Sequence, residues 1–196
     1  EKTALADAEV EYLDHTSNTI YAGFKVKKTD KDFLKDTSII IWTTTPWTIP
    51  ANKALAFNSN IEYSILEIQN LENFDNNKIV VAKKLINQII TTCEIKSYKE
   101  IKTFKGSEFN KTICNHPFSK MKFDYDVPML DAQFVNLEQG TGIVHCAPSH
   151  GPDDFNLCLK NNIPSLYTVD DSGLYTKEIP FFENIHIFKA DNIVIE

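Results

Sequence analysis

Short apolar stretches that suit β-strands recur along most of the sequence, and residues that favour turns separate them. Residues 22–28 alternate apolar and charged side chains, which is typical of a strand with one buried face. Residues 38–42 form a β-branched apolar run, which favours a strand buried on both faces. Further segments of these kinds are residues 61–68, 78–82, 94–98, 127–130, 133–136 and 142–146. Such a chain is restricted to folds in which several short strands share one core.

Helical signals are fewer than strand signals. Apolar residues at positions 85, 86, 89 and 90 have the spacing of a helix face, so residues 83–90 are predicted to be helical. A second helix is expected over residues 151–161, where Pro152 and two acids suit the first turn. The polar residues 70–77 and 103–111 are expected to be surface loops. The sequence therefore predicts an α+β, mainly β domain that is barrel-like and has short peripheral helices.

The chain is expected to form a single domain, residues 1–196. Hydrophobic residues make up 42% of the sequence, so it can bury a sizeable core and is not expected to be disordered. No convincing linker and no internal repeat divides it. The sequence opens on Glu1 instead of Met and closes on a strand-like run at 192–196, so we expect a fragment of a longer protein.

Signals for membranes and export are missing from the sequence. No apolar run approaches the roughly 18 residues that a membrane helix needs, and the polar, acidic start does not resemble a signal peptide. We therefore expect a cytoplasmic protein. No CxxC pair is present, so free thiols in a reducing compartment are expected for Cys93, Cys114, Cys146 and Cys158.

The charge pattern limits nucleic-acid binding. The net charge is -7 and the pI is near 5.3, whereas free-standing nucleic-acid binders usually carry a basic patch. All 20 basic residues are Lys, so the bidentate contacts that Arg makes with phosphate are missing. If the chain handles RNA, we expect it to contact a small piece and to rely on something else for affinity.

Residues 42–52, WTTTPWTIPAN, are unusual for a strand and its turn. The hydroxyls of Thr43, Thr44 and Thr45 lie on alternating faces of a strand end, and Pro46 then forces the chain out of the ladder. Such a row of hydroxyls can line a small polar pocket. Thr is also common in strands for packing reasons and can satisfy local backbone groups, so both interpretations remain open.

A second unusual segment, residues 140–155, reads GTGIVHCAPSHGPDDF. Its two glycines permit a close backbone approach, and the apolar pair before His145 favours a buried strand. The acids Asp153 and Asp154 follow His145 within one turn region. A histidine and a carboxylate near a helix N-terminus can orient water or bind an ammonium group.

The spacing in this second segment disfavours other chemistries. The side chains of His145, Cys146, His150 and Asp154 include metal-ligand types, but HExxH and paired CxxC spacings are absent, so no metal or cofactor is expected. The absence of GxSxG argues against a serine nucleophile. Adjacent strand residues point to opposite faces, so Cys146 and His145 are not expected to form a nucleophilic dyad.

Together the two segments resemble the editing insertion of class I aminoacyl-tRNA synthetases for branched aliphatic amino acids, specifically the isoleucyl type. The hallmark WTTTPWT-x-PAN stands at residues 42–52, and GTG-x-VH-x-AP-x-HG-x-x-D stands at residues 140–154. Valyl and leucyl relatives typically have an Arg within the threonine motif and an acid after its Pro, where this chain has Thr45 and Trp47. Those relatives also lack a histidine at the place of His145.

The resemblance runs nearly from end to end. Residues 3–12 look like the start of the insertion and residues 189–194 look like its end, whereas residues 59–122 add little to the match. The synthetic signatures HIGH and KMSKS are missing. The resemblance therefore implies a piece that edits but does not charge tRNA. Its implied partners are the 3′ end of tRNA(Ile) carrying valine and the rest of a parent synthetase.

The resemblance also implies roles for individual residues. His145 would block the extra methylene of isoleucine, and Asp154 would accept hydrogen bonds from the α-ammonium group, whereas Asp153 would stay solvated. Asn52 would hold substrate or water, and Trp47 would pack beside the terminal adenosine. The pocket for the aminoacyl group and adenosine would be lined by three hydroxyls, those of Thr43, Thr44 and Thr45. The implied catalytic set is Thr45, Asn52, His145 and Asp154.

The reaction that the resemblance implies is hydrolysis of valyl-tRNA(Ile), with valyl-adenylate as a further candidate substrate. An ester is already activated, so positioning a water with help from the free ribose hydroxyl can suffice. His145 as general base is the alternative. Competing hypotheses for the function are a valyl- or leucyl-type editor and a non-catalytic module that binds aminoacyl-adenosine or RNA.

Overall fold

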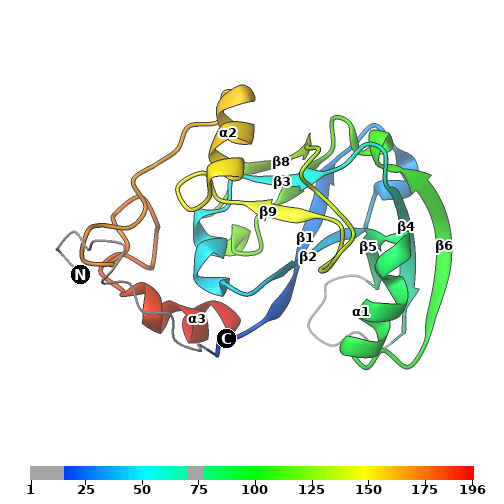
Figure 1. The fold of residues 1–196 in the computed structure, drawn as a ribbon, viewed down its shortest axis with the longest axis horizontal. Coiled ribbons are helices and arrows are strands. Elements are labelled where there is room, and N and C mark those ends of the chain that lie inside the picture. The colour runs from blue at the N-terminus through cyan, green and yellow to red at the C-terminus, as the bar shows by residue number, and fades with distance from the viewer. Residues whose placement is uncertain (1–15, 70–76) are drawn as a thin grey trace, which may run out of the picture.

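The computed structural model describes residues 16–69 and 77–196, which form one nine-stranded sheet with short helices around it (Figure 1). The strands are β1 (Ile20–Lys28), β2 (Ser38–Thr43), β3 (Ala54–Phe57), β4 (Glu62–Ile68), β5 (Lys78–Ala82), β6 (Tyr98–Lys105), β7 (Ile113–Asn115), β8 (Asp126–Asp131) and β9 (Val144–Cys146). The α-helices are α1 (Ile86–Thr92), α2 (Pro152–Lys160) and α3 (Ile187–Ile195). The 3-10 helices are η2 (Asp32–Leu34), η3 (Pro46–Ala51), η4 (Lys83–Leu85), η5 (Gly106–Phe109) and η6 (Ser119–Met121). The prediction of a mainly β domain with short helices is confirmed.

The strand order is β6-β4-β5-β2-β1-β7-β8-β3-β9. Two of the ladders, β2 with β5 and β3 with β8, are parallel, and the others are antiparallel. At one end of the order, β9 comes back into contact with β2, so the sheet curls as a barrel does. No ladder joins the two ends within residues 16–69 and 77–196, so the barrel is not closed.

Two apolar clusters hold the sheet together. The larger cluster includes Ile39 and Ile41 of β2, a strand that is buried on both faces as its β-branched sequence predicts. The smaller cluster joins β3, β9 and α2 through Ala54, Cys146 and Cys158. Figure 1 shows α2 beside these strands, whereas α1 lies at the end of the sheet formed by β4, β5 and β6. The second sequence motif, residues 140–155, therefore spans β9 and the start of α2, which this cluster holds together.

Two of the strand predictions are wrong, one because the strand lies further along the chain and one because no strand forms there. The strand predicted at 94–98 starts only at Tyr98 and continues to Lys105, so it occupies part of the predicted loop at 103–111. β6 lies at an edge of the sheet and pairs only with β4, and an edge strand tolerates the polar side chains that suggested a loop. Residues 133–136 form no strand, because the single buried Val135 closes a turn back to Ala132.

The end of the chain is helical and not a strand. The run at 192–196 lies mostly in α3, where Ala190 and Val194 are buried four residues apart on one face. The short strands β3 and β7 have no counterpart among the predicted segments, since three or four residues give too little pattern. The suggested start of the insertion, residues 3–12, and most of the 70–77 loop lie outside the described residues.

Two further observations concern membrane-spanning helices and the thiols. No helix in the described part of the chain is long and apolar enough to cross a membrane. The cysteines are free thiols, with Cys93 exposed and Cys114, Cys146 and Cys158 buried.

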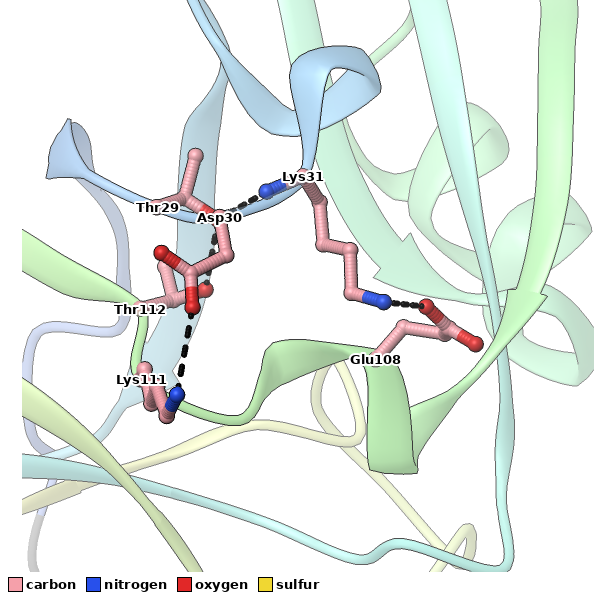
Figure 2. Close-up of polar contacts among 6 residues, drawn as sticks. All are labelled: Thr29, Asp30, Lys31, Glu108, Lys111 and Thr112. Atoms are coloured by element: carbon pink, nitrogen blue, oxygen red, sulfur yellow. Dashed lines mark hydrogen bonds and ion pairs between the residues drawn. The ribbon is translucent and has the colours of Figure 1, made fainter.

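Polar contacts fasten the turn after β1 to the segment before β7 (Figure 2). The hydroxyls of Thr29 and Thr112 lie 3.0 Å apart, within hydrogen-bonding distance. Of two ion pairs there, the shorter joins Lys31 Nζ and Glu108 Oε2 at 2.6 Å. These charged side chains are well exposed, and exposed pairs of this kind stabilise a protein by about 1 kcal/mol or less. The contacts join the turn to the segment before β7.

The turn before β9 depends on two glycines with positive φ. Gly140 has a φ of 79° and Gly142 a φ of 73°, a region that other residues rarely adopt. The turn is pressed against the end of β5, where Ala82 N–H donates to Thr141 O at 2.8 Å. A Cβ on Gly142 would lie 2.4 Å from Ala82 Cβ. A Cβ on Gly140 would lie at an ordinary contact distance, 3.5 Å, from the Trp42 ring.

We expect Gly142→Ala to destabilise the protein more than Gly140→Ala. Both substitutions impose the strain of a left-handed backbone, about 1–2 kcal/mol. Only Gly142→Ala also overpacks the turn, which adds about 1–3 kcal/mol. The free energy of unfolding in urea measures both changes. Equal losses for the two variants would show that the turn moves away from Ala82 without cost.

Candidate functional site

The threonine loop, residues 43–52, leaves the sheet where β2 ends. Pro46 stands at the first position of η3, where its missing N–H costs nothing and its fixed φ suits a helix start. The Thr43 and Thr45 hydroxyls lie 3.3 Å apart, and Thr45 N–H donates to Thr43 Oγ1 at 3.1 Å. Thr43 is buried, whereas Thr44 and Thr45 are exposed. The hydroxyls of Thr43 and Thr45 therefore lie together at the end of β2, whereas the structure gives Thr44 only as an exposed neighbour.

Trp47 is held by residues far along the chain. Its backbone N–H donates to Asp191 Oδ1 of α3 at 2.9 Å, and its carbonyl oxygen accepts a hydrogen bond from Tyr175 Oη. The indole packs edge-on against the His150 ring, with the ring centroids 4.9 Å apart. The backbone at the centre of η3 is thus fixed on both sides, and the Trp47 side chain is half-buried at the rim of the loop.

The end of the threonine loop is fixed from the core side. His116 Nε2 lies 2.9 Å from Ile49 O, and Phe118 N–H donates to His116 Nδ1 at 3.1 Å, so Nε2 carries the proton and donates to Ile49. Tyr125 Oη donates to Asn52 O at 2.5 Å. His116 is 1% exposed and stacks on core aromatic rings, so it is a structural histidine.

His145 joins the two sequence motifs. It lies on β9 opposite Leu55 of β3, and its ring reaches the threonine loop. His145 Nε2 lies 2.8 Å from Thr48 Oγ1, and Nδ1 lies 3.2 Å from Asn52 Nδ2. Both ring nitrogens are therefore engaged by side chains of the first motif.

The directions of these hydrogen bonds follow from Asn52. Its Nδ2 lies 2.9 Å from Ala54 O, which can only accept, so this atom is the amide nitrogen. Its second N–H points to His145 Nδ1, which must then be an acceptor. Nε2 consequently carries the proton and donates to Thr48 Oγ1, whose own proton goes to Thr45 O at 2.9 Å. Asn52 is fully buried, and its Oδ1 has no hydrogen-bond partner among the described residues.

His145 is neutral at physiological pH. Burial lowers its pKa from 6.5 to about 4, and the nearby His150 contributes in the same direction. The pKa of His116 is likewise lowered to about 4, mainly by burial. A neutral ring with a hydrogen bond at each of its two nitrogens is suited to forming a rigid wall. It is less suited to accepting a proton.

These two histidines predict a pH dependence of stability. In the unfolded chain each titrates near its usual pKa, but in the folded protein each binds a proton only near pH 4. The free energy of unfolding is therefore highest above pH 6.5, where both states are neutral at these histidines. It falls as the pH is lowered to about 4, by up to about 3 kcal/mol per histidine. Urea unfolding at a series of pH values should show this loss, with a smaller slope in His145→Asn. A flat profile between these pH values would contradict the burial of both rings.

Asp154 lies in the first turn of α2, where acids suit the helix N-terminus. Its Oδ2 accepts a hydrogen bond from Ala147 N–H at 3.0 Å, which ties α2 to the chain leaving β9. Burial raises the pKa of the Asp154 carboxyl above its usual value. The hydrogen bond from Ala147 N–H acts in the opposite direction, and the charge of Asp153 raises the pKa further. Asp153 is exposed, in agreement with its predicted solvation.

Cys146 lies on the opposite side of β9 from His145, as the alternation of a strand predicts. Its side chain belongs to the cluster with Ala54 and Cys158, and burial raises the pKa of its thiol well above the usual value. It is therefore neither beside the imidazole nor activated as a nucleophile. Within residues 16–69 and 77–196, no group of three His, Cys, Asp or Glu side chains could hold a metal ion.

The structure thus brings most of the predicted site residues to one place. Hydrogen bonds through Thr48 link His145 and its partner Asn52 to Thr45, which contacts Thr43. Asp154 accepts a hydrogen bond from Ala147, two residues after His145. Sequence reasoning missed Thr48, although a Thr three residues after Thr45 can reach its carbonyl in a helical turn. It also missed Tyr125, Tyr175 and Asp191, for which no local pattern gives a signal.

Comparisons with known proteins identify relatives over nearly the whole chain. A family model described as "Leucyl-tRNA synthetase, editing domain" matches residues 17–190. An isoleucine--tRNA ligase of Pelagibacter ubique is 65% identical over 196 residues, which are 100% of this chain and 22% of that protein. One of Gluconobacter oxydans is 41% identical over 204 residues, which cover 100% of this chain and 21% of the relative. The chain spans about a fifth of the length of these relatives.

Solved structures share the fold at low sequence identity. The structure of GlLeuRS-CP1 has a TM-score of 0.64 and 12% identity, with 90% of this chain and 94% of that chain covered. The cytosolic leucyl-tRNA synthetase editing domain of P. knowlesi has a TM-score of 0.62 and 11% identity, with 94% and 95% covered. The open, curled sheet is therefore shared with the leucyl type.

Proposed function

The chain belongs to the aminoacyl-tRNA synthetase editing-domain family, as an editing domain of the isoleucyl type, and on this basis we propose that it hydrolyses valyl-tRNA(Ile). The observation that carries this proposal is the buried, neutral His145 ring, fixed between Thr48 and Asn52 at the threonine loop. A rigid neutral ring is what a site needs to select by size.

Selection by size explains why such a site is needed. A pocket distinguishes side chains that differ by one methylene by about 1–3 kcal/mol, a limit for which isoleucine against valine is the standard example. A second pocket that is too small for isoleucine removes valine without hydrolysing the correct product. We assign the wall of that pocket to His145, whose ring cannot rotate without losing both hydrogen bonds.

Two acceptors are available for donors of the substrate or of a water. Asn52 Oδ1 is a buried acceptor without a partner in the described chain, and such groups are costly unless something donates to them. Asp154 uses Oδ2 for Ala147 N–H and can direct Oδ1 elsewhere. An α-ammonium group carries three donors and fits acceptors of this kind. We assign the α-ammonium to Asp154, and the substrate or a water to Asn52.

The threonine hydroxyls and the rim tryptophan complete the proposed pocket. Thr43, Thr44 and Thr45 would line the binding site of the aminoacyl group and the terminal adenosine. The half-buried Trp47 indole would pack beside the adenosine. A general base is not needed, because an ester is activated and a well-placed water can attack it. His145 is a poor base here because Asn52 already donates to its only acceptor nitrogen.

The proposed partners come from the family to which the chain belongs and from the share of its relatives that it spans. We propose that the 3′ end of tRNA(Ile) enters this site while the rest of a parent synthetase holds the tRNA body in the cytoplasm. An acidic chain without Arg gives little phosphate affinity of its own, so the isolated domain should bind tRNA weakly. Valyl-adenylate is a second proposed substrate.

One deacylation assay decides among the functions. Release of amino acid from valyl-, threonyl- and isoleucyl-tRNA would be measured at high protein concentration. The proposal requires hydrolysis of the valyl ester and sparing of the isoleucyl ester. Preference for the threonyl ester would instead indicate a valyl-type editor. Binding of aminoacyl-adenosine analogues without turnover of any ester would indicate a non-catalytic module.

A further inference from the structure

The segment between α2 and α3 (Figure 1) carries an aromatic side chain, Tyr167, that is 63% exposed. Among the described residues, no second aromatic ring and no lysine ammonium group packs on its ring. By contrast, Lys122 Nζ lies 5.6 Å from the centroid of the exposed Phe181 ring. The exposed Phe188 ring likewise packs against the His186 ring. Tyr167 therefore presents uncovered aromatic surface to solvent.

The backbone on both sides of Tyr167 is fixed by the second sequence motif. Ser149 Oγ donates to Leu166 O at 2.5 Å. Thr168, which is 2% exposed, places its Oγ1 2.9 Å from His150 Nε2. The residues before and after Tyr167 are thus both attached to the chain that leads from β9 into α2.

The carbonyl and the hydroxyl of Tyr167 are held as well. Tyr167 O accepts a hydrogen bond from Thr176 Oγ1 at 2.6 Å. Thr176 N–H donates to Thr168 O at 3.0 Å, which closes a hairpin directly after Tyr167. Tyr167 Oη donates to Asp171 Oδ1 in that hairpin at 3.1 Å. A ring that is held in this way loses little conformational freedom when a flat ligand stacks on it.

Two of these contacts continue to Trp47, the proposed neighbour of the terminal adenosine. His150, the partner of Thr168, packs edge-on against the indole with the ring centroids 4.9 Å apart. Tyr175, in the same hairpin, donates through its Oη to Trp47 O. The exposed Tyr167 ring and the rim of the proposed pocket therefore belong to one hydrogen-bonded and packed unit.

We propose that Tyr167 is a stacking surface for an unpaired base that precedes the terminal adenosine in the 3′ end of the RNA substrate. The inference rests on the proposed function for the identity of that RNA. Every base has a π face, so an aromatic side chain binds single-stranded RNA without Arg and without reading a sequence. Stacking thus supplies affinity that the acidic, Arg-free chain does not gain from phosphate contacts.

The charges beside Tyr167 favour a base over a phosphate. Asp170 and Asp171 follow it in the hairpin, and Asp170 Oδ1 accepts hydrogen bonds from the N–H groups of Ser172 and Leu174. Two carboxylates repel a phosphate backbone, whereas the face of a base is uncharged. A phosphate contact weakens as salt rises because counterions are released. The contribution of Tyr167 to binding should therefore be the same at low and at high salt.

The first test measures binding and needs no hydrolysis. The probe is a short single-stranded RNA with the 3′-terminal sequence of a tRNA and 2-aminopurine at either of the two positions before the terminal adenosine. Its fluorescence falls when the 2-aminopurine stacks. At high protein concentration, the native protein and Tyr167→Phe, which keeps the ring, should quench it. Tyr167→Ala should bind about 5- to 150-fold more weakly, at low and at high salt alike.

The matched control is Tyr98→Ala, which removes an exposed tyrosine from β6 at the other end of the strand order. This variant should bind the probe as the native protein does. Failure of the native protein to quench either probe overturns the proposal, as does equal binding by Tyr167→Ala. A similar loss in Tyr98→Ala also overturns it, because the loss would then not depend on the place of the ring.

The second test compares hydrolysis of valyl-tRNA with hydrolysis of 3′-O-valyl-adenosine, which has the ester and the terminal adenosine but no preceding base. Tyr167→Ala should lower kcat/KM for valyl-tRNA by the same factor, through KM, and should hydrolyse valyl-adenosine as the native protein does. Equal losses with both substrates overturn the proposal, because the ring would then act on the pocket itself. If the native protein hydrolyses neither ester but binding of the probe depends on Tyr167, the proposed function fails while the stacking surface stands.

Discussion

Replacement of His145 by alanine is expected to make isoleucyl-tRNA a substrate. Removing the ring opens the space that the extra methylene needs, and that methylene is worth about 1–3 kcal/mol of discrimination. The rate of isoleucyl-ester hydrolysis should therefore rise by roughly 10- to 200-fold, while valyl-ester hydrolysis continues. Deacylation of both charged tRNAs by the native and variant proteins measures this change.

His145→Phe is the matched control for the alanine variant. Phenylalanine keeps a ring of similar bulk but has no nitrogen, so it separates the wall from the general base. If His145 forms the wall of the pocket, the phenylalanine variant should still spare the isoleucyl ester. If His145 is the general base, both variants should lose hydrolysis of the valyl ester. If neither substitution changes either rate, His145 is structural and both roles are wrong. Urea unfolding verifies that each variant is folded.

Substitution of Asp154 by asparagine is expected to cause the largest loss of valyl-ester hydrolysis. Asparagine can keep the hydrogen bond from Ala147 N–H and the shape of the carboxylate, but it removes the negative charge that faces the proposed ammonium group. Loss of one partner of a buried charge pair costs about 2–5 kcal/mol. The rate should fall by roughly 30- to 5,000-fold, measured as initial deacylation at subsaturating tRNA.

The neighbouring acid provides the control for this loss. Asp153 is exposed in the same helical turn, so Asp153→Asn changes the net charge and the helix N-terminus by the same amount. We expect that variant to retain its activity within a few-fold. Similar losses in the two variants would assign the effect to the overall charge or to the helix terminus. An unchanged rate for Asp154→Asn would remove Asp154 from the site.

The sequence predicted the elements whose residues carry a repeated pattern. The β-branched run of β2 and the Gly-Pro-Asp-Asp start of α2 were recognisable because burial and the residue preferences of a first helical turn act on neighbouring residues. The pocket residues were recognisable only through the resemblance to a family, since threonines at a strand end also have an ordinary structural explanation. The opposite orientation of His145 and Cys146 followed directly from the alternation of a strand.

Contacts between distant segments could not be predicted in the same way. Tyr175 and Asp191 fix the backbone of Trp47, yet nothing in the sequence around either residue indicates a contact with Trp47. The tautomer of His145 depends on Asn52, whose orientation depends in turn on the carbonyl of Ala54. The edge strand β6 was misplaced because its polar residues resemble a loop when its only neighbour, β4, is unknown.

The anchoring of Trp47 by Tyr175 and Asp191 also sets when a newly made chain acquires its site. Asp191 follows Trp47 by 144 residues. A ribosome adds roughly 5–20 residues per second, so Asp191 is synthesised about 7–30 s after Trp47. A chain that terminates before residue 175 would contain both sequence motifs and still lack the backbone contacts that fix Trp47. The backbone contacts that fix Trp47 are therefore complete only in a chain that has been translated at least as far as Asp191 in α3.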